Sequence, residues 1–180
     1  MSWNFSTANF NIRLPVSDQD GDALYELLKQ ESVVEHIPRL AMNVSAQVLD
    51  ELRRMAMRFD TKEAAFWLIE GRYDQQLLAR IGIQRINWMM LNAQLQWELG
   101  DRVDDSVLLE VVPEIIQYCF RDLGLHRLEM RLKPGQVEHQ QRLQSLGFER
   151  EGVLPAQQEF LGEPIDHEIW SIINQQQHTN

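Results

Sequence analysis

Two segments decide the fold: AQLQWELG (residues 93–100) and YCFRDLGLHRLEMRL (118–132). In the first, apolar residues alternate with glutamines and a glutamate, which is the period of a half-buried strand. The second begins on a helical apolar stripe, reaches Gly124 as a helix-ending residue, and then alternates again over 125–133. A strand, a helix and a second strand in this order leave room for a crossover, so the two strands are predicted to pair in parallel.

Five other segments carry strand patterns. Before the central unit, apolar residues alternate with polar ones over 9–16, 64–71 and 76–86. After it, two closing strands are predicted over 147–154 and 166–173. The run of strands before the crossover has connections short enough for antiparallel pairing, so the sheet is expected to be mostly antiparallel with one parallel pair.

Helices are predicted between these strands. Ser17 with Asp20 three positions later resembles a capping box for one helix, and Asn43 or Ser45 is a suitable N-cap for the next. A short helix carrying Leu143 follows the parallel strand. The fold class is therefore α/β, an α+β mixed sheet with helices on both faces, and a ligand is expected to enter where neighbouring strands part.

Composition limits the class of protein. The 180 residues fit one domain over 1–173 with a polar tail over 174–180, and 44% apolar with 24% charged residues is typical of a globular chain. The net charge of −10 would repel a phosphate backbone, so no nucleic acid is expected. The single cysteine, Cys119, allows no internal disulfide or cysteine zinc site and is read as core. No signal peptide or membrane span is recognisable, so a cytoplasmic location is expected.

The segments WELG (97–100), 118–132 and LQSLGFEREGVL (143–154) together resemble the GCN5-related N-acetyltransferase (GNAT) superfamily, in particular its RimJ/RimL-like branch of ribosomal-protein N-acetyltransferases. Gly162 and the Asp166–His167 pair add to the resemblance. It implies a GNAT-like fold in which the parallel pair is splayed to form a cofactor cleft. It also implies transfer of an acetyl group from acetyl-CoA to a primary amine, such as a basic protein N-terminus, without a metal.

The resemblance also implies site residues. Glu98 matches the glutamate of the ELG strand and is predicted as the base, directly or through water; the alternative is a solvated strand carboxylate. His139 stands where the branch has a hydroxyl residue and is predicted as the general acid for the thiolate; the alternative is that it caps the edge of the core. Contacts to acetyl-CoA are assigned to Leu99, Arg102, Val103 and Gln136.

One segment departs from the family pattern. The diphosphate loop should fall over 103–109, which reads VDDSVLL and contains no glycine, and Asp104 and Asp105 would repel a diphosphate. Pro113 would kink a helix that begins near Ser106, or else begin a shorter one. The alternative function is therefore a catalytically degenerate GNAT-fold protein that acts as a binding or regulatory module.

Two other groups of residues attract attention. Trp88, Met89, Met90 and Leu91 lie where a hairpin turn should be polar, so they either fold beneath a neighbouring element or form a contact to a second copy or a protein partner. Asp166 and His167 lack the companions of a metal site and are expected to make a structural hydrogen bond. The acidic chain is expected to suit a basic substrate.

Overall fold

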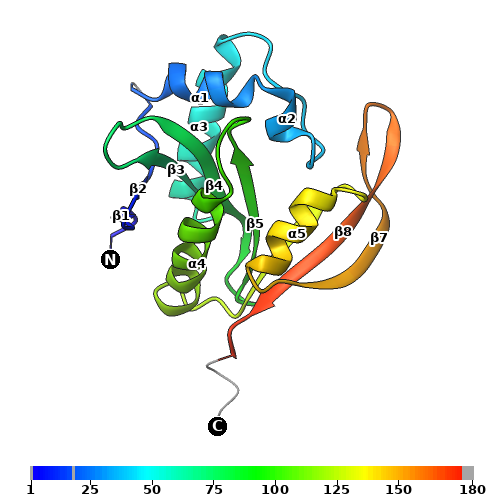
Figure 1. Ribbon diagram of the computed structural model, residues 1–180. Helices are drawn as coiled ribbons and strands as arrows, with labels where there is room; N and C mark the ends of the chain where they lie inside the picture. Colours follow the sequence, from blue (N-terminus) through cyan, green and yellow to red (C-terminus); the bar gives the residue numbers. More distant parts are fainter. Residues whose placement is uncertain (1, 18, 176–180) are drawn as a thin grey trace.

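The computed structural model describes residues 2–17 and 19–175. Its strands form one eight-stranded sheet in the order β1-β2-β3-β4-β5-β6-β8-β7 (Figure 1). The strands are β1 (Phe5–Ser6), β2 (Phe10–Arg13), β3 (Ala64–Gly71), β4 (Leu77–Asn87), β5 (Asn92–Leu99), β6 (Arg127–Leu132), β7 (Glu149–Phe160) and β8 (Glu163–Ile173). The helices are α1 (Gly21–Leu28), α2 (Glu31–Val34), α3 (Ala46–Asp60), α4 (Ser106–Arg121) and α5 (Val137–Ser145).

Helices cover both faces of the sheet, as the sequence predicts. Alternation along β3 divides its side chains between two apolar clusters: Phe66 and Leu68 pack with α1 and α3, whereas Trp67 and Ile69 pack with α4. Cys119 lies in the second cluster and is fully buried, which confirms its place in the core; burial raises the pKa of its thiol.

The parallel pair β5–β6 is short, and all other pairings in the sheet are antiparallel. Only residues 92–94 of β5 pair with residues 127–129 of β6. Beyond Gln94 the two strands separate, while β5 stays paired with β4 as far as Leu99. The predicted crossover and splay are therefore confirmed, and the splay opens toward the N-terminus of α4.

Helix α4 begins at Ser106 and continues through Pro113. The alternative of a shorter helix starting at the proline is therefore wrong. Its N-terminus lies at the end of β5, where the resemblance expects the acyl donor. No helix in the described part of the chain is long and apolar enough to cross a membrane.

Some elements differ from their predicted form. Asp20 is the N-cap of α1 instead of the third residue of a capping box, and its carboxylate accepts hydrogen bonds from Arg13 and from the Val16 amide. The strand predicted over 9–16 is only four residues long. β7 and β8 form one long hairpin that includes a register shift between Leu154 and Gln158. Of the predicted tail 174–180, residues 176–180 lie outside the described residues.

Candidate active site

The splay between β5 and β6 is bridged by the segment that follows α2. Nε2 of His36 lies 2.9 Å from the Trp97 carbonyl oxygen on β5, and the His36 carbonyl accepts the Lys133 amide, which follows β6, at 3.0 Å. Because the Gly100 amide donates to Leu78 on β4, the alternate residues Trp97 and Leu99 direct their backbone groups away from β4 and into the splay. Leu99 therefore offers backbone groups to a ligand there.

Glu98 points to the α3 face and is fully buried. Arg80 holds it with two hydrogen bonds of 3.0 and 2.7 Å, and the Gln96 amide donates a third at 2.7 Å. Burial opposes ionisation, but the Arg80 guanidinium outweighs it, so the pKa of Glu98 lies below its ordinary value. The alternative of a solvated strand carboxylate is wrong, because the antiparallel neighbour β4 supplies a buried arginine directly opposite.

Arg80 connects Glu98 to a second carboxylate. Its Nη1 lies 2.5 Å from Glu51 on α3, and Glu51 also accepts from Arg39 at 3.1 Å and from Arg54 at 2.9 Å. Burial disfavours the charged form of Glu51, but Arg80 and Arg39 lower its pKa well below the usual range. Each charged side chain of this network has a partner of opposite charge, which is the condition under which buried ions are tolerated.

His139 lies on the other face of β5. Its Nδ1 accepts a hydrogen bond from the Trp97 indole at 3.2 Å, and its ring stacks on His36 at 3.9 Å between centroids. Burial, followed by His36 and Arg142, lowers the pKa of His139 to about 2, and burial lowers that of His36 to about 4. The His139 imidazole is therefore neutral, with its proton on Nε2 because Nδ1 is an acceptor.

The structure does not bring Glu98 and His139 to the same face of the sheet. Consecutive side chains alternate along β5, so Glu98 faces α3 while Trp97, which holds His139, faces α4 and α5. The residue that contacts both the His139 ring and the backbone of β5 is His36, which the sequence reasoning missed. It follows a four-residue helix and belongs to no recognisable motif, so no signal could have found it.

At the N-terminus of α4, a carboxylate of the chain itself accepts a hydrogen bond from a backbone amide. Oδ1 of Asp104 accepts the Ser106 amide at 2.8 Å, and Asp105 pairs with Arg142 of α5 at 2.8 Å. The Ser106 contact lowers the pKa of Asp104. Arg102 and Val103 line a cavity of about 620 Å³ between α1, β4 and this loop, whereas Gln136 caps α5 and lies outside its lining.

These contacts decide how an acyl donor would fit. The backbone of Leu99 suits a narrow pantetheine arm, which needs amide partners along one strand edge. In the loop, the Ser106 amide is already bonded to Asp104 and is therefore not free for a diphosphate.

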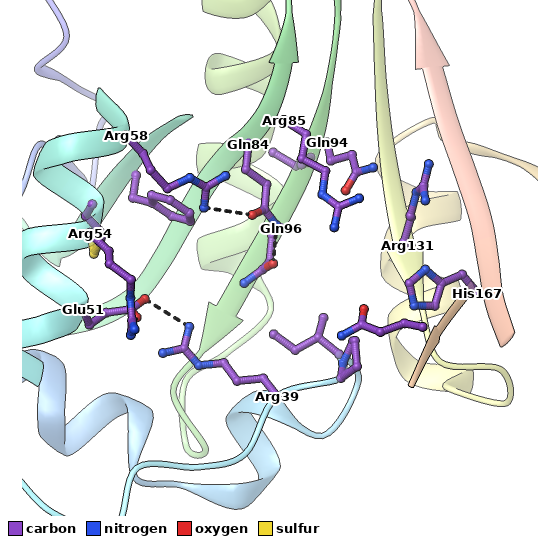
Figure 2. A pocket seen from close by; sticks show the side chains of 16 residues that line it. Arg39, Glu51, Arg54, Arg58, Gln84, Arg85, Gln94, Gln96, Arg131 and His167 are labelled. Atoms are coloured by element: carbon purple, nitrogen blue, oxygen red, sulfur yellow. Dashed lines mark hydrogen bonds and ion pairs between the residues drawn. The ribbon is translucent and has the colours of Figure 1, made fainter. Parts of the chain in front are cut away.

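A second cavity, of about 450 Å³, lies on the α3 face of the sheet beside the splay. Figure 2 shows side chains from α3, β4, β5, β6 and β8 pointing into it. We call it the arginine pocket, because five arginines and one glutamate are its charged lining residues: Arg39, Arg54, Arg58, Arg85, Arg131 and Glu51. Its floor includes Gln94 to Gln96, the point at which β5 leaves β6.

The Asp166–His167 pair divides between two environments. Asp166 accepts the Ala156 amide at 2.9 Å, as expected of a structural hydrogen bond. The same expectation is wrong for His167, which is 7% exposed, lines the arginine pocket and has no hydrogen-bond partner at either ring nitrogen. Among the described residues no group of three His, Cys, Asp or Glu side chains could hold a metal.

The turn at residues 88–91 is partly folded under. The Trp88 indole donates to the Lys62 carbonyl at 2.9 Å, while Met89 and Met90 are 93% and 69% exposed. The expectation that these residues fold beneath a neighbouring element therefore holds for Trp88 and not for the methionines. Contact to a second copy stays a prediction.

The sheet with one short parallel pair, opening toward a helix N-terminus and flanked by a pocket, defines an acyltransferase fold. Comparisons with known proteins agree. The family described as Acetyltransferase (GNAT) domain matches residues 10–149. The chain belongs to this family, and the protein is thus an N-acetyltransferase-type acyltransferase.

Relatives resemble the chain over almost its whole length. The uncharacterized N-acetyltransferase YoaA of Bacillus subtilis is 24% identical over 159 residues, covering 88% of this chain and 90% of its own. The ribosomal-protein-S5-alanine acetyltransferase of Vibrio fischeri superposes with a TM-score of 0.81 at 16% identity, covering 96% and 97% of the two chains. The Microcin C7 self immunity acetyltransferase MccE, in complex with acetyl-CoA and AMP, has a TM-score of 0.82 at 17% identity, covering 93% and 94%.

Proposed function

We propose that the protein transfers the acetyl group of acetyl-CoA to a primary amine, with a protein N-terminus as one acceptor to be tested. The observation that supports this proposal is the β5–β6 splay, which has free strand edge at Leu99 and the arginine pocket against its narrow end. A thioester lodged along β5 and an amine in the pocket would meet where the strands part. Such positioning supplies a large part of the rate enhancement of a two-substrate reaction.

The reaction needs few protein groups. The neutral amine nitrogen attacks the thioester carbonyl, a C–N bond forms, the C–S bond breaks, and the amine's extra proton leaves as the thiolate gains one. For the leaving thiolate we keep His139 as the proposed partner: with Nδ1 accepting from Trp97, the ring's single proton lies on Nε2. Because its low pKa keeps the ring neutral, His139 would stabilise the thiolate by a hydrogen bond from Nε2, and water would carry the proton that the amine loses to the thiolate.

Glu98 is retained as the proposed base, in competition with a role that positions its neighbours. Its pairing with Arg80 favours the second role, since a carboxylate with a lowered pKa is a weak proton acceptor. Removal of the amine proton through water would still need an accessible oxygen. The two roles predict different stabilities and different kinetics for a Glu98 variant.

The acceptor is tested on two classes of amine. The Vibrio fischeri neighbour is described as acting on a ribosomal protein, and the MccE structure contains AMP. We therefore propose assaying both short peptides with a free N-terminus and small nucleotide-bearing or phosphorylated amines. The expected cytoplasmic location remains a prediction alongside this proposal.

The first experiment is thermal unfolding with and without acetyl-CoA, followed by thiol release with each amine. A ligand at 100 times its Kd stabilises the native state by about 2.7 kcal/mol. We expect a saturable rise in Tm with acetyl-CoA; a rise that is absent with pantetheine, which lacks the nucleotide end, would indicate that the loop over 103–109 takes part in binding. No rise at millimolar acetyl-CoA, together with no thiol release, would overturn the proposal.

One further candidate function is a binding module that has lost acyl transfer. It is favoured by the bond between Asp104 and Ser106 and by the His36 bridge across the splay. The same experiment separates the two functions, because a binding module of this kind would neither be stabilised by acetyl-CoA nor release thiol.

A further inference from the structure

The arginine pocket concentrates positive charge on an acidic protein. The whole chain carries −10, yet five arginines line this cavity with one glutamate. Counting the carboxylates that pair with them and with buried Arg80, six guanidinium groups face three acids: Glu51, Glu98 and Glu129. A cavity with a surplus of guanidinium groups is suited to an anion and unsuited to a second cation.

Two of the arginines have no carboxylate partner in the part of the chain that the structure describes. Arg58 donates only to the Gln84 side chain, at 3.3 Å, and lies over the Phe66 ring. Arg85 makes no ion pair within residues 2–17 and 19–175. Arg131 shares Glu129 with Arg127 and still reaches the pocket from β6. Guanidinium groups left without acids in a concave site are available to a ligand.

The backbone turns Arg85 toward the pocket. In a regular strand, neighbours Gln84 and Arg85 would point to opposite faces, yet both line the pocket. The cause is a register irregularity between Gln84 and Asn87, where Arg85 has a φ of 51°. A non-glycine residue in this conformation costs about 1 kcal/mol or more, and bulges of this kind re-aim side chains at functional sites.

His167 supplies an independent sign of a missing ligand. The residue is only 7% exposed, and neither ring nitrogen has a hydrogen-bond partner among the described residues. Figure 2 shows the ring facing the same space as Arg85 and Arg131. A buried imidazole without hydrogen bonds is costly unless a bound group completes it. Neutral imidazole has one donor and one acceptor, which suit an acid oxygen and an amine together.

We propose that the arginine pocket binds the acceptor and that this acceptor carries an anionic group, a carboxylate or a phosphate, close to its primary amine. The inference rests on the proposed acetyl transfer and names the substrate class for it. Arg85 and Arg131 bind the anion, His167 hydrogen-bonds the acceptor, and the amine is directed to the splay at Gln94–Gln96. This proposal differs from the expectation of a basic substrate, which considered only the total charge of the chain and stays a prediction.

The test compares amines with and without an anionic group. Thiol release from acetyl-CoA is measured with O-phosphoethanolamine against ethanolamine, and with the peptide amides Ser-Asp-Glu against Ser-Asn-Gln, which separate phosphate from carboxylate. We expect kcat/KM to be at least tenfold higher for the anionic member of one pair. In Arg85→Gln and Arg131→Gln the ratio within that pair should fall toward one, mainly through KM.

A matched control is Arg53→Gln. Arg53 lies on α3 beside Arg54, is largely exposed and does not line the pocket, so its variant removes the same charge at a short distance. It should leave the ratio within each pair unchanged. Equal rates for both members of both pairs, or a preference that survives Arg85→Gln and Arg131→Gln, would overturn the inference.

A binding measurement separates this inference from the proposed function. Calorimetry with O-phosphoethanolamine and with Ser-Asp-Glu amide is done on the protein without acetyl-CoA. Binding that is lost in Arg85→Gln, with no thiol release from any amine, would leave the anion site standing and overturn acetyl transfer. Thiol release from neutral amines, with no binding of either anionic probe, would do the reverse.

Discussion

At the scale of single residues, the buried ion pair of Glu98 and Arg80 has the largest energetic consequence. Both side chains are fully buried, and Glu51 supplies the only other acid that contacts Arg80 in the described residues. Removing one partner of a buried pair costs about 3–5 kcal/mol, because the other charge is left uncompensated. Replacing both partners by apolar residues costs much less.

We therefore predict that Glu98→Gln lowers the free energy of unfolding by about 3 kcal/mol, measured by urea denaturation. The double variant Arg80→Met/Glu98→Met should recover much of this loss. If Glu98 is the base, Glu98→Gln also lowers kcat by at least about 100-fold at a temperature where it is folded, and the pH profile loses a limb. A stable, fully active Glu98→Gln enzyme would contradict both roles.

The stacked pair His36–His139 predicts a dependence of stability on pH. Burial lowers the pKa values to about 4 and about 2, from the 6.5 of an exposed histidine. Between pH 6.5 and 4 the unfolded chain therefore binds protons that the folded chain does not, so the free energy of unfolding falls as pH falls. Each histidine contributes about 1.4 kcal/mol per pH unit in this range.

The measurement is urea denaturation at pH steps from 7.5 to 4.5. In His139→Gln, whose amide oxygen can still accept from the Trp97 indole, the slope should decrease by about one proton. A slope that is the same in the variant and the parent protein would show that the His139 ring is not held neutral in the fold.

At the scale of elements, the N-terminus of α4 carries a carboxylate where the sequence predicts the diphosphate loop. Asp104 bonds the Ser106 amide and places a negative charge where the acyl donor's phosphates would approach. Like charges at an exposed site repel weakly, because water and salt screen them. Asparagine at position 104 would keep the hydrogen bond and remove the charge.

Asp104→Asn is therefore expected to tighten acetyl-CoA binding about fivefold, measured by calorimetry. Asp122→Asn removes the same charge at the other end of α4 and serves as the control, which should leave the Kd unchanged. Weaker binding in Asp104→Asn would mean that the carboxylate itself contributes to the site, for example through a cation shared with the donor.

Elements with a strong local pattern could be predicted from the sequence. β3 occupies the predicted 64–71, because alternation is a property of neighbouring residues. Ser45 takes the predicted N-cap position of α3, but its side chain makes no capping hydrogen bond. The four-residue α2 and the His36 bridge could not be predicted, since their bonds are made to β5 and β6. The arginine pocket has the same origin: Arg54, Arg85 and Arg131 come from three elements.

At the scale of the whole molecule, the net charge and the turn at 88–91 have opposite effects on self-association. Met89 and Met90 expose apolar surface that favours contact with a second copy, while each copy carries −10. Repulsion between two such chains acts over a Debye length of about 30 Å at 0.01 M salt and about 3 Å at 1 M. The predicted homodimer should therefore strengthen as salt is raised, unlike one held by ion pairs.

Light scattering after size exclusion tests this at 0.02 and 0.5 M salt. The expected result is a mass that rises toward that of two chains at high salt and stays at one chain in Met89→Asp/Met90→Asp. Leu161→Asp, on the exposed turn between β7 and β8, adds a similar charge at another apolar site and should still dimerise. A single-chain mass at both salt concentrations would contradict the homodimer, because the chains would not associate even when salt screens their repulsion.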